Sequence, residues 1–158
     1  MSKSRASVGG SMLRSMLVSA LLALPMAAQA EGLLLNDIKS QNGVQLTVDE
    51  LKQLMPNAKV VSYQKEGSTR YWTNEPDGKF VASSDIRRDV GLMMKGGARK
   101  SAQGTWHVGD NGTYCVTIDW GQRPENWCRY IFKVGGKYYG VKTVNDGATI
   151  AHEFEFSK

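Results

Sequence analysis

The sequence predicts a mainly β protein, a small antiparallel barrel built from hairpins and preceded by one short helix. From about residue 58 onward, apolar and polar residues alternate, as they do along half-buried strands. The pairs "DG", "NG" and "GG" separate these runs, and such pairs favour hairpin turns. Only "LTVDELKQLMP" (46–56) has helical spacing. A sandwich is the alternative, but closing the sheet into a barrel removes exposed strand edges, so we favour the barrel.

The first thirty residues have the pattern of a signal peptide. Three cations and no acidic residue accompany an apolar run, Met16–Leu24, which is too short to span a bilayer. Ala28-Gln29-Ala30 then gives the small-x-small pattern of a cleavage site. We therefore expect a leader over 1–30 and one β-rich domain over 31–158. We expect the domain to be periplasmic or secreted, with no stable membrane insertion once the leader is removed.

The charge of the remaining chain gives no reason to expect a nucleic-acid partner. Three of the 20 Lys and Arg residues lie in the leader, which leaves 17 against 15 Asp and Glu, a net charge of +2. The remaining basic residues are scattered along the chain rather than gathered in a dense patch.

The N-terminal part of the domain is expected to contain an arm and then the helix. Residues 31–43 mix apolar and polar residues and predict a packed or frayed arm. Thr47 and Glu50 have the spacing of a capping box, and Pro56 ends the helical run. Val48, Leu51 and Met55, helped by Leu54, fall on one face, so the helix needs a sheet to cover that face.

The alternating segments predict eight strands. Hairpin turns are expected at Asp77-Gly78, Asn111-Gly112 and Gly135-Gly136, and "DG" recurs at 146–147. Residues 86–103 are expected to be mostly loop, with Val90–Met94 as a further candidate strand. The expected strands are Lys59–Gln64, Thr69–Thr73, Lys79–Ser83, Thr105–Val108, Thr113–Trp120, Trp127–Val134, Lys137–Val144 and Thr149–Phe156.

A weak internal repeat supports the hairpin interpretation. Residues 71–85 align without gaps on 105–119, which matches Trp72 with Trp106 and Phe80 with Tyr114. We interpret the repeat as recurring hairpin chemistry rather than a solenoid, because the copies are irregular and few.

Cys115 and Cys128 are the only cysteines, and we expect them to form a disulfide. An even count of cysteines in an exported protein indicates a disulfide. Only His107 and His152 could complete a zinc site, and His152 alternates with apolar residues as a solvent-facing residue would. The spacing is also not that of a redox C-x-x-C motif. The midpoint of the two cysteines lies in "GQRPEN" (121–126), so they can face each other across a hairpin.

The aromatic residues are the candidate ligand contacts. Trp72 and Trp106 open equivalent hairpins and are expected mainly in the core. For Trp120 and Trp127, a place at the barrel opening in contact with a ligand and a place in the core are equally expected. The candidate ligand-binding residues are Trp106, Trp120, Trp127 and Tyr130.

The sequence does not favour an enzyme, although it leaves that possibility open. Glu153 and Glu155 alternate with phenylalanines, as on a half-buried strand, while Asp85 and Asp119 follow strands as turn residues do. None of the common catalytic, phosphate-binding or dinucleotide-binding motifs occurs. We assign no catalytic residue, no metal site and no cofactor.

The order of these features resembles a family of small exported proteobacterial proteins catalogued as a domain of unknown function. The shared pattern is G-x-W, a D/N-G turn and two cysteines, found here as Gly104, Trp106, Asn111-Gly112, Cys115 and Cys128. Its G-x-W beside a hairpin is also lipocalin-like. The resemblance implies a periplasmic or secreted bacterial β protein and supplies no activity.

Two functions are therefore expected of an exported, non-enzymatic β domain. The first is a binding module for a small molecule or a cell-envelope component. The alternative is a protein–protein module, such as an inhibitor or immunity protein of an envelope enzyme. The loop 86–103 and the hairpin tip 121–126 would be its contact surfaces.

Overall fold

The structure is a computed structural model that describes residues 32–65, 67–85, 100–121 and 124–158. Two helices lie among the described residues, α1 (Leu35–Ser40) and α2 (Val48–Leu54). The strands are β1 (Val44–Gln45), β2 (Lys59–Tyr63), β3 (Thr69–Thr73), β4 (Lys79–Asp85), β5 (Lys100–Val108), β6 (Tyr114–Asp119), β7 (Pro124–Val134), β8 (Lys137–Val141) and β9 (His152–Ser157).

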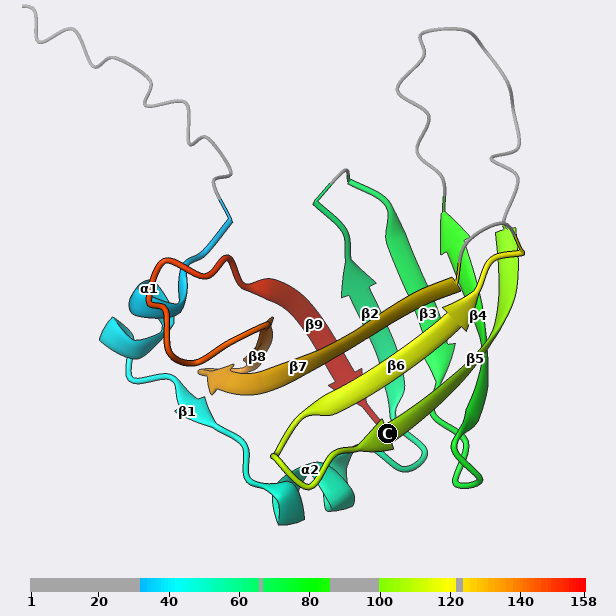
Figure 1. Ribbon diagram of the computed structural model, residues 1–158, viewed down its shortest axis with the longest axis horizontal. Coiled ribbons are helices and arrows are strands. Elements are labelled where there is room, and N and C mark those ends of the chain that lie inside the picture. The colour runs from blue at the N-terminus through cyan, green and yellow to red at the C-terminus, as the bar shows by residue number, and fades with distance from the viewer. Residues whose placement is uncertain (1–31, 66, 86–99, 122–123) are drawn as a thin grey trace, which may run out of the picture. The chain divides into compact units, whose positions relative to one another are not determined.

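Strands β2 to β9 form a closed antiparallel barrel, which confirms the predicted fold (Figure 1). Each of these strands pairs with the next one along the chain, and the first pairs with the last to close the sheet. The closing register places Val60 opposite Phe156. β1 is an extra strand that pairs with the second half of β7.

Alternate residues of these strands point into the barrel and form its core. Helix α2 covers one end of the barrel, where Leu51 and Met55 are fully buried. This arrangement supplies the apolar cover that the amphipathic helix needs. The buried residues of the barrel core are Leu46, Leu51, Met55, Ala58, Val60, Trp72, Phe80, Ala82, Ala102, Tyr114, Val116, Ile118, Ile131 and Phe154.

Helix α2 begins as the capping box predicts. Thr47 is the N-cap, and its hydroxyl oxygen accepts a hydrogen bond from the backbone N–H of Glu50 at 3.2 Å. The Glu50 carboxylate in turn accepts from the backbone N–H of Thr47 at 2.7 Å. Hydrogen bonding to Thr47 lowers the pKa of Glu50.

The N-terminal arm contains a helix that the sequence pattern did not predict. In α1, Leu35 and Ile38 are fully buried and pack with Phe132 and Val141. Phe132 follows the inward-facing Ile131 in β7, so this second cluster lies on the outer surface of the barrel. A six-residue helix is too short to show a helical period, and its packing on the barrel stabilises it.

Several predicted strand boundaries were wrong. β5 begins at Lys100 and β7 at Pro124, earlier than expected, because both pair along the full length of their neighbours. β8 ends earlier and β9 begins later than predicted. Gly135-Gly136 forms the expected two-residue turn between β7 and β8. The connections that contain Asp77-Gly78 and Asn111-Gly112 are longer than two residues, although Gly78 and Gly112 have positive φ. The candidate strand 90–94 lies outside the described residues.

The internal repeat corresponds to two hairpins that are neighbours in the barrel, β3–β4 and β5–β6. Trp72 stacks on Phe80 with their ring centroids 5.3 Å apart. In the second hairpin, Trp106 lies 6.5 Å from Tyr114. The repeated residues are therefore pairs of core aromatics, one pair for each hairpin.

The glycine of the G-x-W pattern has a packing role. Gly104 lies opposite Phe80 across β4 and β5, and a Cβ at this position would be 2.1 Å from Cε2 of the Phe80 ring. We expect Gly104→Ala to lower the free energy of unfolding by about 1–3 kcal/mol in chemical denaturation, because the ring has to move within a filled core.

Two variants test this explanation. Gly136→Ala is the matched control, since a Cβ there meets nothing within 4 Å, and its effect should be small. Adding Phe80→Leu to Gly104→Ala should relieve part of the loss. A strictly additive double variant would contradict the proposed clash.

Candidate functional site: the polar mouth

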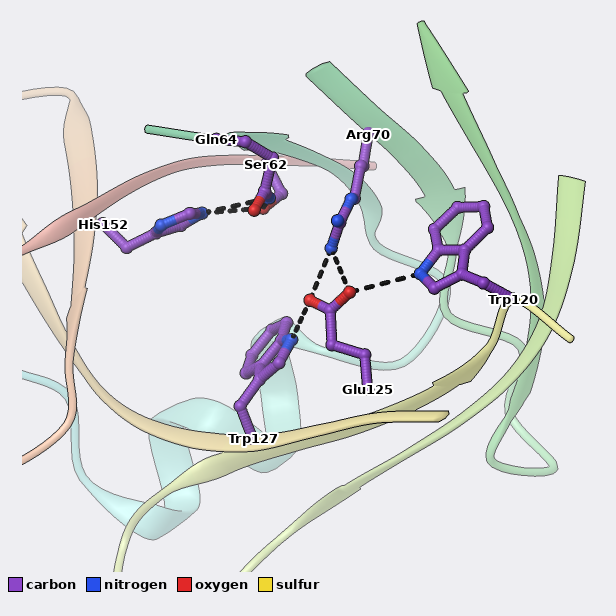
Figure 2. Close-up of polar contacts among 7 residues, drawn as sticks. All are labelled: Ser62, Gln64, Arg70, Trp120, Glu125, Trp127 and His152. Carbon is purple, nitrogen blue, oxygen red and sulfur yellow. Dashed lines mark hydrogen bonds and ion pairs between the residues drawn. The ribbon is translucent and has the colours of Figure 1, made fainter. Parts of the chain in front are cut away.

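The barrel interior becomes polar at the end away from α2. Ser62 and Arg70 have the same inward register as Val60 and Trp72, because side chains two residues apart in a strand share a face. We call this end the polar mouth. It comprises Ser62, Gln64, Arg70, Trp120, Glu125, Trp127 and His152, which Figure 2 shows.

Glu125 is the centre of the polar mouth. Both of its carboxylate oxygens accept hydrogen bonds from Nη1 of Arg70. The indole N–H groups of Trp120 and Trp127 each donate to one oxygen at 3.2 Å. Figure 2 shows the two indoles on either side of the carboxylate, with Arg70 reaching it from β3. One carboxylate therefore fixes two aromatic rings and a guanidinium.

The ion pair lies partly inside the barrel but remains in contact with solvent. The side chain of Arg70 is 16% exposed and that of Glu125 is 30% exposed. Nε of Arg70 is buried and has no hydrogen-bond acceptor among the described residues. A buried N–H without an acceptor is uncommon and costly in a folded protein.

Further cations lie against the two indoles. Cζ of Arg70 is 5.3 Å and Nζ of Lys100 is 5.8 Å from the Trp120 ring centroid. Cζ of Arg129 is 5.6 Å from the Trp127 ring centroid. Burial lowers the pKa of Arg129, and the charge of Glu125 opposes this effect. Arginine stays charged in proteins, so three cationic side chains of the described residues lie against the two indoles that bond to Glu125.

A second polar group joins β2 to β9. The Ser62 hydroxyl lies 2.9 Å from Nε2 of His152, and the side-chain amide of Gln64 donates to the same hydroxyl oxygen at 2.9 Å. Because Ser62 accepts from Gln64, its own hydrogen is available to donate to Nε2 of His152. The His152 ring also packs on Phe154 at 4.9 Å.

The expectation that His152 faces solvent is therefore wrong. His152 lies on the same face of β9 as Phe154 and Phe156, which point inward. The glutamates that alternate with these residues, Glu153 and Glu155, lie on the opposite face.

The structure brings together two of the four candidate ligand residues, Trp120 and Trp127. Trp106 lies toward the α2 end, where its N–H donates to the backbone oxygen of Glu75 at 2.9 Å and its ring packs on the core. Tyr130 packs against the second cluster, on the outer face. Sequence reasoning missed Arg70 and Glu125, although each lies two residues from an inward-facing tryptophan.

The other acidic residues considered from the sequence point outward. Glu153 pairs with Lys137 at 3.0 Å. Glu155 accepts a hydrogen bond from Tyr63, which raises the pKa of Tyr63 to about 12. Asp119 accepts from the backbone N–H of Gly121 at 2.8 Å. Within the described ranges, no group of three or more His, Cys, Asp or Glu side chains is placed to hold a metal ion.

The predicted disulfide is confirmed. Cys115 and Cys128 are bonded and lie directly opposite each other in β6 and β7. Their neighbours Val116 and Trp127 point into the barrel, so the disulfide lies on the outer face. The cysteines therefore staple the hairpin that carries Glu125.

A separate cavity of about 350 Å³ lies beside the turn between β3 and β4. Its polar lining includes Glu75, Asp77 and Lys79, and the last two form an exposed ion pair at 3.8 Å. Exposed charges of this kind are already well hydrated, so this cavity is the weaker candidate for ligand binding.

Comparison with known proteins places the chain in a family. Residues 18–128 match the family described as protein of unknown function (DUF995), a range that includes Arg70, Glu125 and both tryptophans of the polar mouth. No curated protein and no solved structure matches the chain. In the part of the chain that the structure describes, no helix is long and apolar enough to cross a membrane. Because the match spans more than half of its length, the chain belongs to the DUF995 family of proteins of unknown function.

Proposed function

We propose that this protein is an exported bacterial binding module, without catalytic activity, that holds a small molecule or a small part of an envelope component at the polar mouth. The observation that carries the proposal is the Glu125 carboxylate, which fixes Arg70 and two indoles at one end of a barrel whose other end is filled. Rings and donors held in place before binding lose little conformational entropy when a ligand arrives.

Stability alone does not account for this arrangement. A partly buried ion pair costs desolvation energy, and apolar residues of similar volume usually stabilise a core as well or better. Most buried side chains of the barrel core toward α2 are apolar. The pair at the mouth therefore supports a role in recognition, since ligand sites combine aromatic surface with a few placed polar groups.

Export is part of the proposal. The leader pattern of residues 1–30 supports it, as does the disulfide, because disulfides persist in oxidising compartments. A periplasmic or secreted location would expose the mouth to metabolites, glycans and lipid fragments of the envelope.

Tryptophan fluorescence of the purified protein tests ligand binding. Titration with a broad panel of periplasmic metabolites, glycans and lipids should give a saturable change for at least one compound. We expect Trp120→Phe or Trp127→Phe to reduce this change, because the indole N–H bond to Glu125 is lost. Trp106→Phe is the matched control and should keep the response, since Trp106 lies toward the other end. A flat response across the whole panel would overturn the proposal.

The alternative of a protein–protein module has less support. Most of its expected contact surface, residues 86–99, lies outside the described residues, as do Gln122 and Arg123 of the hairpin tip. Glu125, expected at that tip, instead lies inside the mouth and bonds to Arg70. A small ligand is therefore the occupant that the described residues favour.

A further inference from the structure

We propose that the ligand of the polar mouth is a small organic acid, an apolar ring-sized body carrying a carboxylate that binds Arg70. This inference rests on the proposed function and specifies the chemistry of its ligand. Three observations on the described residues support it: an Arg70 donor that has no acceptor among them, the cations that lie against the indoles, and the filled interior below the mouth.

The first observation is the way Arg70 uses its donors. A guanidinium has five N–H donors, and paired carboxylates often take two of them from different nitrogens. Here Glu125 accepts hydrogen bonds from Nη1 alone, and the buried Nε–H has no acceptor among the described residues. An oxygen of a second carboxylate would satisfy this donor with a charge-assisted hydrogen bond once a shift of the Arg70 side chain opens the enclosed Nε to the mouth.

The second observation is the charge around the rings. Arg70, Lys100 and Arg129 lie against the two indoles, while Glu125 is the carboxylate bonded to them. Both oxygens of Glu125 already accept hydrogen bonds from Arg70 and an indole, so a cationic ligand finds its natural partner occupied. The remaining positive charge attracts an anion and repels an amine.

The third observation limits the size of the ligand. Below the mouth, the Trp127 ring meets Phe154 at 5.7 Å and Tyr114 at 5.9 Å between centroids. Phe154 and Tyr114 are 1% and 0% exposed, so the space beyond Trp127 is occupied by core side chains. A long acyl chain would have to displace these core side chains, so the apolar body of the proposed ligand is limited to about one ring.

Three probes with the same body and different head groups test the inference. They are 3-phenylpropionate, 3-phenylpropanol and 3-phenylpropylamine, titrated into the full protein with tryptophan fluorescence as the readout. We expect the acid to bind at least about tenfold more tightly than the alcohol, because hydrogen bonds to charged groups contribute more than neutral ones. The amine should bind most weakly. Decanoate should bind no better than 3-phenylpropionate if the interior stays filled.

Two variants connect the preference to the named residues. Arg70→Gln combined with Glu125→Gln removes both charges together, which avoids leaving one buried charge without its partner. This double variant should lose the preference for the acid over the alcohol. Lys100→Gln changes an exposed residue and should weaken acid binding about two- to threefold while leaving the alcohol unchanged.

The outcomes separate this inference from the proposed function. Equal binding of the three head groups, or an unchanged acid preference in the folded double variant, would overturn the inference and leave ligand binding at the mouth intact. If the double variant does not fold, the head-group comparison in the unchanged protein and the Lys100→Gln result decide whether the inference holds. The absence of a response to any compound of the broad panel would overturn both.

Discussion

Replacing Asn74 with alanine is expected to lower the free energy of unfolding by about 3 kcal/mol, although Asn74 is remote from the proposed ligand site. Asn74 is fully buried at the α2 end of the barrel. Its side-chain oxygen accepts from the indole N–H of Trp72 at 3.0 Å and from the Tyr114 hydroxyl at 2.9 Å. Its amide donates to the backbone oxygen of Met55 at 3.1 Å.

The size of the loss follows from what remains unpaired. Trp72 keeps a second acceptor, the Tyr114 oxygen at 3.1 Å, and the Met55 oxygen keeps the N–H of Ala58. The Tyr114 hydroxyl hydrogen, however, loses its acceptor in a site where burial already raises the pKa of Tyr114. A buried donor without an acceptor costs about 1–3 kcal/mol, and the deleted amide also leaves a small cavity.

Two controls accompany the Asn74 variant in urea denaturation. Asn126→Ala removes an asparagine that is exposed and accepts from Thr117 at 2.5 Å, and its effect should stay within about 0.5 kcal/mol. Tyr114→Phe should cost less than Asn74→Ala, because Trp72 still donates to Asn74. If all three variants unfold at the same denaturant concentration as the unchanged protein, the buried network does not stabilise the fold.

Removing the disulfide is expected to have an effect of similar size. The two cysteines are 13 residues apart in sequence, and closing a loop of this length stabilises the folded state by about 3 kcal/mol on the chain-entropy estimate. We expect the Cys115→Ala/Cys128→Ala variant to unfold at lower temperature and lower denaturant concentration than the oxidised protein.

The reductant provides the control for this variant. Reducing the unchanged protein should lower its unfolding temperature to near that of the double variant, and the same reductant should leave the double variant unaffected. Free thiols before reduction, together with an unchanged melt, would contradict the role of Cys115 and Cys128 as a staple. Because the staple holds β6 against β7, its loss should also weaken the ligand response at Trp120 and Trp127.

Local patterns explain why much of the fold could be predicted. The capping box of Thr47 and Glu50 is contained within four residues, and strand alternation is read from neighbours two apart. The disulfide could be predicted from the expected export and from the position of the two cysteines about the midpoint of one hairpin. Helix α1 shows the limit, because Leu35 and Ile38 are stabilised by contacts with distant strands rather than by a local helical pattern.

The polar mouth was harder to predict because its central ion pair joins two strands that are not neighbours. Arg70 in β3 and Glu125 in β7 are 55 residues apart and meet only across the closed barrel. Sequence alone does not specify the tilt and stagger that align them. Their inward orientation was nevertheless available, since Arg70 precedes Trp72 by two residues and Glu125 precedes Trp127 by two. The same alternation would have placed His152 with Phe154.

The pairing of β2 with β9 has a consequence for how the chain reaches its folded state. Val60 pairs with Phe156, so the barrel can close only when residues nearly a hundred positions apart in sequence come together. Folds dominated by such distant pairings form slowly, on the scale of milliseconds to seconds. The hairpin bridged by Cys115 and Cys128, in contrast, brings together residues only 13 apart in sequence. We therefore expect this hairpin to form before β9 pairs with β2, because closing a short loop costs less entropy than closing a long one.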